Sequence, residues 1–423
     1  MVDELLSSSP FIDGRGEFFC RGCLGKNLFS GLDLGVLPIA NELSLSLESN
    51  VEKFPLHLRI CIDCGLGQVA DVVTPERIFR DYRYLSSMST TFLKHASDFV
   101  TQQVESMTFL PSDWVLEIAS NDGYLLKNFI PHGIRVVGVE PAENVAAVSQ
   151  SLGIETISDF FSSKLAIDLL SSRGYPRLVV ANNVMAHVPD LIDFVKGLSI
   201  LAGPETNFCI ENPSLTNVLL GMQFDTIYHE HYSYLSASAV DRISQLHGLQ
   251  LFRIEELSTH GGSNRYWLRK LDGSSSPEPS VDKVKTYEKV NGLFEVNEWE
   301  NLSSKVSNIL SEFQTWLTLG TGETKRVYGY GAAAKASTLL NSINVEASNL
   351  VLGIADLSRE KQGRFMPPCA IEIISLEQLV SANPTDIIVF PWNIKTEIVA
   401  QLRSLFDKKV RLWCAIPNIH EVA

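Results

Sequence analysis

The chain has 423 residues and a formal net charge of -14, from 35 basic and 49 acidic side chains. Its length exceeds one ordinary core, so we expect two or three domains. The acidic charge argues against nucleic acid as a partner, although a local basic cleft for a phosphorylated ligand is compatible with it. Without an apolar run of about 18 residues or a secretory signal, the sequence predicts a cytoplasmic protein with no membrane partner.

Four cysteines near the N-terminus form two pairs, Cys20-Arg-Gly-Cys23 and Cys61-Ile-Asp-Cys64. Two such knuckles can present four thiolates tetrahedrally to Zn²⁺, and the glycine after the second pair suits a turn. Four thiolates leave no open coordination position, so the ion would be structural rather than catalytic. We therefore predict a small zinc-binding module over residues 1–75.

Residues 76–272 alternate short apolar strands with helices. The expected strands are Trp114 to Ala119, Arg135 to Glu140, Leu178 to Asn182 and Phe208 to Glu211, and the expected helices begin at Tyr124 and Ala142. Strand, helix, strand repetition predicts a doubly wound, Rossmann-like α/β domain with a parallel sheet. Its ligand would bind at the carboxyl ends of the strands.

The ends of these strands carry polar side chains that suit an adenosine ligand. Glu140 could accept both hydroxyls of a ribose, in NAD or in S-adenosylmethionine. The first turn, Glu117-Ile-Ala-Ser-Asn-Asp-Gly123, lacks the three glycines of a dinucleotide site and offers acceptors for the ammonium of S-adenosylmethionine instead. The expected cofactor residues are Glu117, Ser120, Asn121, Gly123, Glu140, Pro141, Asp159, Phe160, Asn182 and Asn183.

Residues 224–234, Phe-Asp-Thr-Ile-Tyr-His-Glu-His-Tyr-Ser-Tyr, gather two histidines, carboxylates and three tyrosines. The segment could be a metal site built on His229 and His231, a proton-transfer site in which Glu230 and one histidine share the work, or a loop with surface histidines. In an extended strand alternate residues share a face, so joint action of Tyr228, Glu230 and His231 requires a turn.

The last third, residues 273–423, begins with a composition break and a long helical stretch, and a second α/β unit follows from Arg326. Gly329-Tyr-Gly331 with an acid about 25 residues later resembles half of a dinucleotide fingerprint, which would make the protein a NAD-binding oxidoreductase. Against this, Ala334 replaces the third glycine. Lys335 at the start of the helix suits a phosphate as well as a nicotinamide cofactor.

Taken together, the chain resembles the C-methyltransferases of nucleotide-activated deoxysugar biosynthesis. The resemblance rests on the cysteine pairs and on ordered motifs along nearly the whole chain: Glu117 to Leu126, Gly138-Val-Glu-Pro141, Ala181 to Asp190, residues 224–234, Ser258-Thr-His-Gly-Gly-Ser263, Gly329 to Lys335, Lys361-Gln-Gly-Arg364 and Phe390-Pro-Trp-Asn393. It implies a zinc module, a central S-adenosylmethionine domain and a cofactor-free, Rossmann-like C-terminal domain. We expect a monomer.

The resemblance also implies the reaction, methylation of the carbon next to the 4-keto group of a dTDP-linked 6-deoxyhexose, with C-3 favoured and C-5 possible. Such a reaction needs a base for the proton α to the carbonyl and a donor for the enolate oxygen. The family's active-site residues correspond to Tyr82, His187, Tyr228, Glu230 and His231, and its substrate contacts to Tyr84 and Lys335.

Within that set, His231 is the expected base, because an imidazole can accept a proton at neutral pH. Glu230 would orient the sugar or the imidazole, and a tyrosine hydroxyl would donate to the enolate. We expect His229 to take no part in the chemistry. The alternatives are a NAD-binding oxidoreductase and a noncatalytic nucleotide-sugar binding protein.

Overall fold

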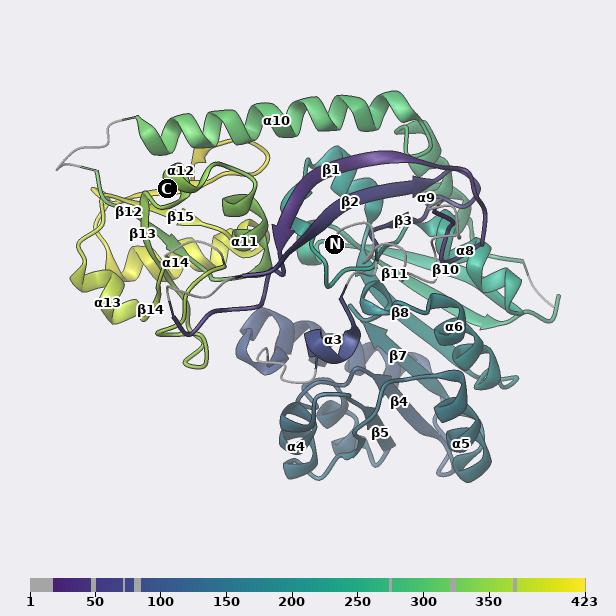
Figure 1. Cartoon of the computed structure of the whole chain (residues 1–423). Coiled ribbons are helices and arrows are strands. Elements are labelled where there is room, and N and C mark those ends of the chain that lie inside the picture. Colours follow the sequence, from purple (N-terminus) through teal and green to yellow (C-terminus); the bar gives the residue numbers. More distant parts are fainter. Residues whose placement is uncertain are drawn as a thin grey trace.

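A computed structural model of the chain describes residues 18–46, 51–70, 73–79, 85–273, 276–319, 325–367 and 371–422. Three β-sheets organise these residues (Figure 1). A four-stranded sheet lies near the N-terminus, a seven-stranded sheet in the middle and a six-stranded sheet near the C-terminus. The predicted fold class, two Rossmann-like α/β domains beside a small N-terminal module, is confirmed. None of the described helices is long and apolar enough to cross a bilayer.

The N-terminal sheet has the order β1-β2-β3-β9 and is antiparallel throughout. Its strands are β1 (Leu28–Pro38), β2 (Lys53–Cys61), β3 (Gly67–Gln68) and β9 (Ser233–Tyr234). β9 comes from a distant part of the chain and forms the end of the segment 224–234 that carries His229 and His231. The second cysteine pair lies at the end of β2, so the sheet connects the expected metal centre to the expected active site.

The central sheet has the order β10-β11-β8-β7-β4-β5-β6, in which β11 alone runs antiparallel to its neighbours. Its strands are β4 (Trp114–Ile118), β5 (Arg135–Val139), β6 (Glu155–Ile157), β7 (Leu178–Asn182), β8 (Asn207–Pro213), β10 (Leu249–Leu257) and β11 (Ser263–Lys270). All five residues of β4 are buried, as the apolar run of a central parallel strand requires. The carboxyl ends of β4, β5, β7 and β8 therefore share one edge.

Helices cover both faces of the central sheet. They are α3 (Thr90–Ser106), α4 (Glu143–Ser151), α5 (Ser163–Arg173), α6 (Leu191–Ile200), α8 (Ala237–Leu246) and α9 (Pro279–Val290). The expected helix at Tyr124 is wrong, because two short 3-10 turns, Leu126–Asn128 and Ile130–His132, stand there instead. Pro131 lacks an N–H for a continuing helix, and Gly133 ends the second turn with a positive φ of 70°.

The C-terminal sheet has the order β14-β13-β12-β15-β16-β17, parallel except for its last strand. Its strands are β12 (Val327–Tyr330), β13 (Val351–Ala355), β14 (Ile373–Ile374), β15 (Asp386–Val389), β16 (Arg411–Cys414) and β17 (His420–Glu421). Its helices are α11 (Ala334–Asn341), α12 (Val345–Ser348), α13 (Leu376–Ser381) and α14 (Lys395–Leu405). The remaining short helices are α2 (Pro75–Phe79) and α7 (Leu215–Leu220).

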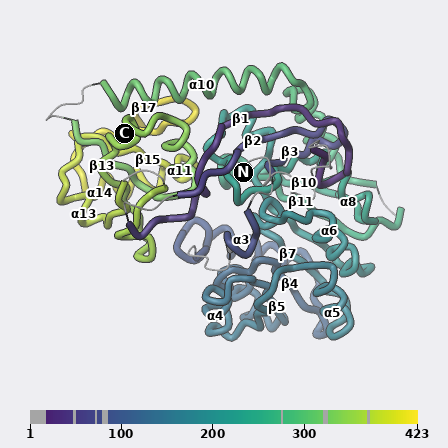
Figure 2. Tube along the Cα trace, viewed as in Figure 1, coloured from purple at the N-terminus to yellow at the C-terminus, as the bar shows by residue number. Residues whose placement is uncertain are grey.

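The long helix α10 (Val296–Thr318) joins the parts of the molecule. It runs from the end of the central domain to the C-terminal domain and lies over the arched ribbon of β1 and β2 (Figures 1 and 2). Its buried side chains, from Trp299 to Leu317, belong to one apolar core with Leu58 and Ile60 of β2 and with the C-terminal sheet. The zinc-binding region and the C-terminal domain therefore share a core.

Candidate active site

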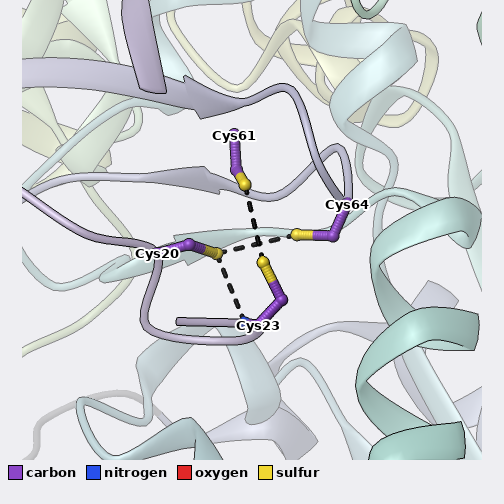
Figure 3. A group of neighbouring side chains, drawn as sticks. All are labelled: Cys20, Cys23, Cys61 and Cys64. Atoms are coloured by element: carbon purple, nitrogen blue, oxygen red, sulfur yellow. Dashed lines mark hydrogen bonds between the residues drawn. The ribbon is translucent and has the colours of Figure 1, made fainter. Parts of the chain in front are cut away.

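The sulfur atoms of Cys20, Cys23, Cys61 and Cys64 converge on one point (Figure 3). All lie within 4.8 Å of one another, and Cys20 Sγ to Cys64 Sγ and Cys23 Sγ to Cys61 Sγ each measure 3.6 Å. Four thiolates about 2.3 Å from a tetrahedral Zn²⁺ lie about 3.8 Å apart. The cluster thus fits zinc in size, donor type and number.

Tight turns after each cysteine pair produce this convergence. Leu24 N donates to Cys20 O and Gly65 N to Cys61 O, at 2.9 and 2.8 Å. Leu24 and Gly65 have φ values of 61° and 80°. Gly65 is thus the residue suited to the turn, because a residue without a Cβ adopts this conformation at no steric cost.

Arg21 lies between the cysteines of the first pair, and its side chain is fully buried. Its Nη2 donates to Val69 O at 2.6 Å and its Nη1 to Pro189 O at 3.1 Å. The guanidinium also lies 5.6 Å from the ring centroid of Tyr232. Pro189 and Tyr232 follow His187 and His231 closely in the sequence, so the first knuckle contacts both histidine-bearing segments.

The predicted cofactor residues gather at the carboxyl edge of the central sheet. Glu140 Oε2 accepts from Asn121 N and Glu140 Oε1 from Ala142 N, both at 2.9 Å. Ala119, Asn121 and Asn183 have positive φ values of 54°, 49° and 55°, which cost a side-chain-bearing residue free energy and cluster at functional sites. Asp159 and Phe160 lie after β6, and Phe160 is partly exposed.

Several buried acceptors at this edge have no hydrogen-bond partner among the described residues. They are Glu117 Oε2, Ser120 Oγ, Asp122 Oδ1, Asn182 Oδ1 and Asn183 Oδ1. Burial, followed by the charges of Asp122 and Glu140, raises the pKa of Glu117 well above its ordinary value. Unpaired buried oxygens are costly and call for donors. The ammonium of S-adenosylmethionine would supply donors to these oxygens, and its positive charge and that of the sulfonium would complement the nearby carboxylates, so the residues fit this cofactor.

The segment from Tyr228 to His231 is a turn, in which His231 N donates to Tyr228 O at 3.0 Å. The turn brings Tyr228 Oη within 2.9 Å of His231 Nε2. His231 Nδ1 lies 3.2 Å from Thr226 O, and because a carbonyl only accepts, Nδ1 carries the proton. Nε2 is then the basic nitrogen and accepts from the tyrosine.

The His231 imidazole is neutral and lies beside a second imidazole. The ring centroids of His187 and His231 are 4.6 Å apart. Burial, and then the neighbouring His187, hold the pKa of His231 well below the usual histidine value. Burial also lowers the pKa of His187 to about 4. Because His187 follows β7, the pair lies where the cofactor edge meets the polar segment.

The Glu230 carboxylate turns away from His231 and toward the N-terminal module. Glu230 Oε1 accepts from Asn41 N at 3.0 Å and from Asn41 Nδ2 at 3.1 Å. Glu230 Oε2 is buried without a partner in the described part of the chain, and burial raises the pKa of this carboxyl. The expectation that Glu230 could orient the imidazole is wrong, because Thr226 and Tyr228 hold that ring. The main-chain oxygen of Glu230 accepts from His187 Nδ1 at 2.7 Å.

A pocket opens beside His231 and is lined by residues of the central and C-terminal domains. Its polar lining includes Asn212, Thr226, Tyr228, His231, Ser233, His260 and Lys335. Lys335, from the first turn of α11, donates to Asn393 Oδ1 at 2.6 Å and lies 4.1 Å from the Trp392 ring centroid. Burial lowers the pKa of Lys335 to about 8, and the nearby Asp225 opposes this.

Comparisons with known proteins agree with this architecture. A zinc-binding domain model matches residues 20–79, a methyltransferase domain model residues 92–254, and the C-methyltransferase C-terminal domain model residues 258–417. The chain is 29% identical to the C-methyltransferase NovU of Streptomyces niveus over 402 residues, which are 94% of this chain and 95% of that protein. Together these matches show an S-adenosylmethionine-dependent C-methyltransferase. The predictions of zinc and S-adenosylmethionine are thereby confirmed.

Solved structures resemble part of this C-methyltransferase. Magnesium protoporphyrin IX methyltransferase from Synechocystis PCC 6803 with bound S-adenosylmethionine is 15% identical, with a TM-score of 0.34, over 46% of this chain and 88% of that one. A SAM-dependent methyltransferase from Anabaena variabilis ATCC 29413 is 14% identical, with a TM-score of 0.34, over 42% of this chain and 85% of that one.

The C-methyltransferase brings together His187, Tyr228, His231 and Lys335, while the carboxylate of Glu230 points to Asn41. His229 lies apart, donating to Phe54 O at 3.2 Å. Tyr82 and Tyr84 lie outside the described residues. Sequence reasoning missed Asn41 and Asn212, which carry no motif of their own. It also gave no role to His260, although the two glycines after this residue signal a sharp turn.

Proposed function

We propose that this C-methyltransferase methylates the carbon next to the 4-keto group of a dTDP-linked 6-deoxyhexose, with C-3 favoured and C-5 possible. One observation carries the proposal. His231 is neutral and its Nε2 carries no proton. Its ring centroid lies 4.6 Å from that of His187, and this pair stands between the carboxyl edge of the central sheet and the pocket. Methylation at carbon needs a base beside the methyl donor, and this pair supplies one.

In the proposed reaction, bound S-adenosylmethionine supplies an electrophilic methyl group. The acceptor sugar displaces the Tyr228 hydroxyl from His231 Nε2. That nitrogen then takes the α-proton, and the C–H electron pair moves onto the carbonyl oxygen as an enolate. The freed Tyr228 hydroxyl donates to the enolate oxygen. The enolate carbon would take the methyl group as the carbon–sulfur bond breaks, with that electron pair left on the sulfur of the departing S-adenosylhomocysteine, and His231 returns its proton to solvent.

The charged neighbours have supporting roles in this proposal. Lys335 lines the pocket, and its ammonium would stabilise negative charge on the enolate or on the diphosphate. Glu230 would accept from a sugar hydroxyl through its unpaired Oε2. Tyr82 and Tyr84 stay predictions from the family resemblance, as further contacts to the substrate.

The NAD alternative finds no support in the C-terminal glycine loop. Asp356, the acid that would hold a ribose, accepts from Ala332 N at 2.9 Å and from Ser358 N at 2.8 Å. Lys361 lies 3.5 Å from the same carboxylate and donates to Ala332 O. The loop thus uses its own acid internally, and Gly331 packs against Pro391. In a thermal-shift assay we expect S-adenosylmethionine to raise the unfolding temperature and NAD to leave it unchanged.

The function is tested by incubating the enzyme with methyl-labelled S-adenosylmethionine and a panel of dTDP-4-keto-6-deoxyhexoses. NMR then locates the label. The expected result is a new carbon–carbon bond at C-3, or at C-5, of one member of the panel. Label on oxygen or nitrogen, or transfer to sugars without a ketone, would refute the proposal.

A further inference from the structure

Asn212, near the end of β8, is 1% exposed, yet its amide is unpaired within the part of the chain that the structure describes. Asn212 Oδ1 and Nδ2 both lack a hydrogen bond to any described residue. Leaving a buried polar group unpaired costs free energy, because the group has lost its water without gaining a partner. In a folded protein such a residue calls for an explanation, and a ligand is one.

The alternation of β8 decides where this amide points. Successive residues of a strand face opposite sides of the sheet. Glu211 faces α3 and is paired there, with His95 at 2.9 Å and Arg265 at 3.1 Å. Asn212 faces the other side and lines the pocket that also holds Tyr228 and His231. The unpaired amide therefore lies in the wall of the reaction site.

Two further unpaired groups line the same pocket. Ser233 Oγ comes from β9, and His260 Nε2 comes from the turn before β11. His260 is held with φ 54° and ψ 23°, a left-handed conformation that costs a residue with a side chain free energy. Burial lowers the pKa of His260 to about 4, so its ring is neutral. Three elements far apart in the sequence thus present unpaired polar atoms to one space.

We propose that Asn212, with Ser233 and His260, forms a subsite that hydrogen-bonds a ring hydroxyl of the acceptor sugar. A hydroxyl both donates and accepts, as the unpaired amide requires. A site built to hydrogen-bond a hydroxyl rejects an analogue that lacks it far more strongly than an apolar pocket rejects a missing methylene. This inference rests on the proposed function and adds to it the group by which the acceptor is selected.

The kinetic test compares Asn212→Leu with the wild type on a 4-keto sugar that has all its ring hydroxyls and on analogues that each lack one of them. We expect the wild type to prefer one hydroxylated acceptor at least 100-fold in kcat/KM, and Asn212→Leu to reduce that preference below about threefold. An unchanged preference would overturn the subsite. The subsite would also be refuted if kcat/KM of Asn212→Leu changed with the nucleotide base of the acceptor and not with the sugar hydroxyl.

The stability test needs no substrate, so it separates this inference from the proposed function. Removing unpaired buried polar atoms should leave the unfolding temperature of Asn212→Leu unchanged or higher. The matched control is Asn264→Leu at the directly opposite position of β11, where the amide donates to Tyr266 Oη at 3.3 Å. That change should lower the unfolding temperature. A clear fall for Asn212→Leu would assign the residue a structural role and refute the subsite.

If the wild type methylates no keto sugar at all, the proposed function fails. In that case, an unfolding temperature of Asn212→Leu at or above that of the wild type would still indicate that Asn212 binds a polar ligand, in another acceptor. If the wild type is active and Asn212→Leu keeps the same preference for the hydroxylated acceptor, the subsite alone is refuted.

Discussion

The central and C-terminal sheets share a doubly wound plan but treat their strand ends in opposite ways. At the edge of the central sheet, Glu117, Asn182 and Asn183 have buried oxygens to which no described residue donates. At the matching edge of the C-terminal sheet, Asp356 accepts from two main-chain N–H groups, as Glu140 does, but it is also paired with Lys361 of its own domain. Among the described residues, every buried side-chain nitrogen or oxygen without a partner lies at or before Arg265.

This difference shows that fold and ligand are separate properties. A sheet edge becomes a binding site when its polar groups are left for a ligand to satisfy, and a scaffold when they satisfy one another. The C-terminal domain, a scaffold in this sense, contributes Lys335 of α11 to the lining of the pocket.

The largest effect is expected for His231→Gln, which removes the proposed base beside the carboxyl edge of the central sheet. We expect kcat to fall about 10²- to 10⁴-fold, the contribution of general base catalysis. The dissociation constant of S-adenosylmethionine, measured by calorimetry, and the zinc content should not change. Methylation at the wild-type rate in this variant would remove His231 from that role.

A matched pair of changes compares the two edges directly. Glu140→Ala should weaken S-adenosylmethionine binding about 10- to 100-fold, since a hydrogen bond to a charged group contributes about 1.5–3 kcal/mol. Asp356→Ala should leave that affinity unchanged. Calorimetric titration of both variants measures this, and a loss of affinity at Asp356 would end the distinction between the edges.

Lys335→Met tests what the scaffold contributes. The pKa of Lys335 is lowered to about 8, so its ammonium is present below that pH and is lost above it. Wild-type activity should fall as the pH rises through about 8. We expect Lys335→Met to be roughly 10-fold slower at pH 7 and to lose this alkaline limb. In Lys335→Arg, the limb should move to higher pH, because arginine keeps its charge.

The smallest effect is expected for Asp356→Asn. Weakening the internal bonds of the glycine loop should lower the free energy of unfolding by about 1–3 kcal/mol, measured by denaturant titration. Neither NAD nor S-adenosylmethionine should bind differently. NAD binding gained or lost in this variant would contradict the scaffold role.

Local patterns in the sequence predict much of this structure. The cysteine pairs, the apolar strands and the acid after β5 are signals of a few residues each, and these expectations match the structure. The helix expected at Tyr124 fails because Pro131 and Gly133, several residues later, decide the backbone there.

The parts that escaped prediction depend on contacts between distant residues. Asn41 reaches Glu230 across 189 positions, and nothing near either residue signals the pair. Asn212 reads as an ordinary strand residue until the sheet places it beside His231. Even the turn at Glu230, which decides which side chains act together, is held by Tyr234 and Thr226 rather than by a turn motif.

The pairing of β3 with β9 has a consequence for anyone who recombines such enzymes. Gln68 is the partner of Ser233, and Val69 N donates to Tyr232 O at 3.2 Å, one residue from His231. The first 75 residues are therefore not a cassette that can be exchanged between relatives to alter acceptor choice. A chimera needs both halves of this seam, residues 67–69 and 232–234, from the same parent.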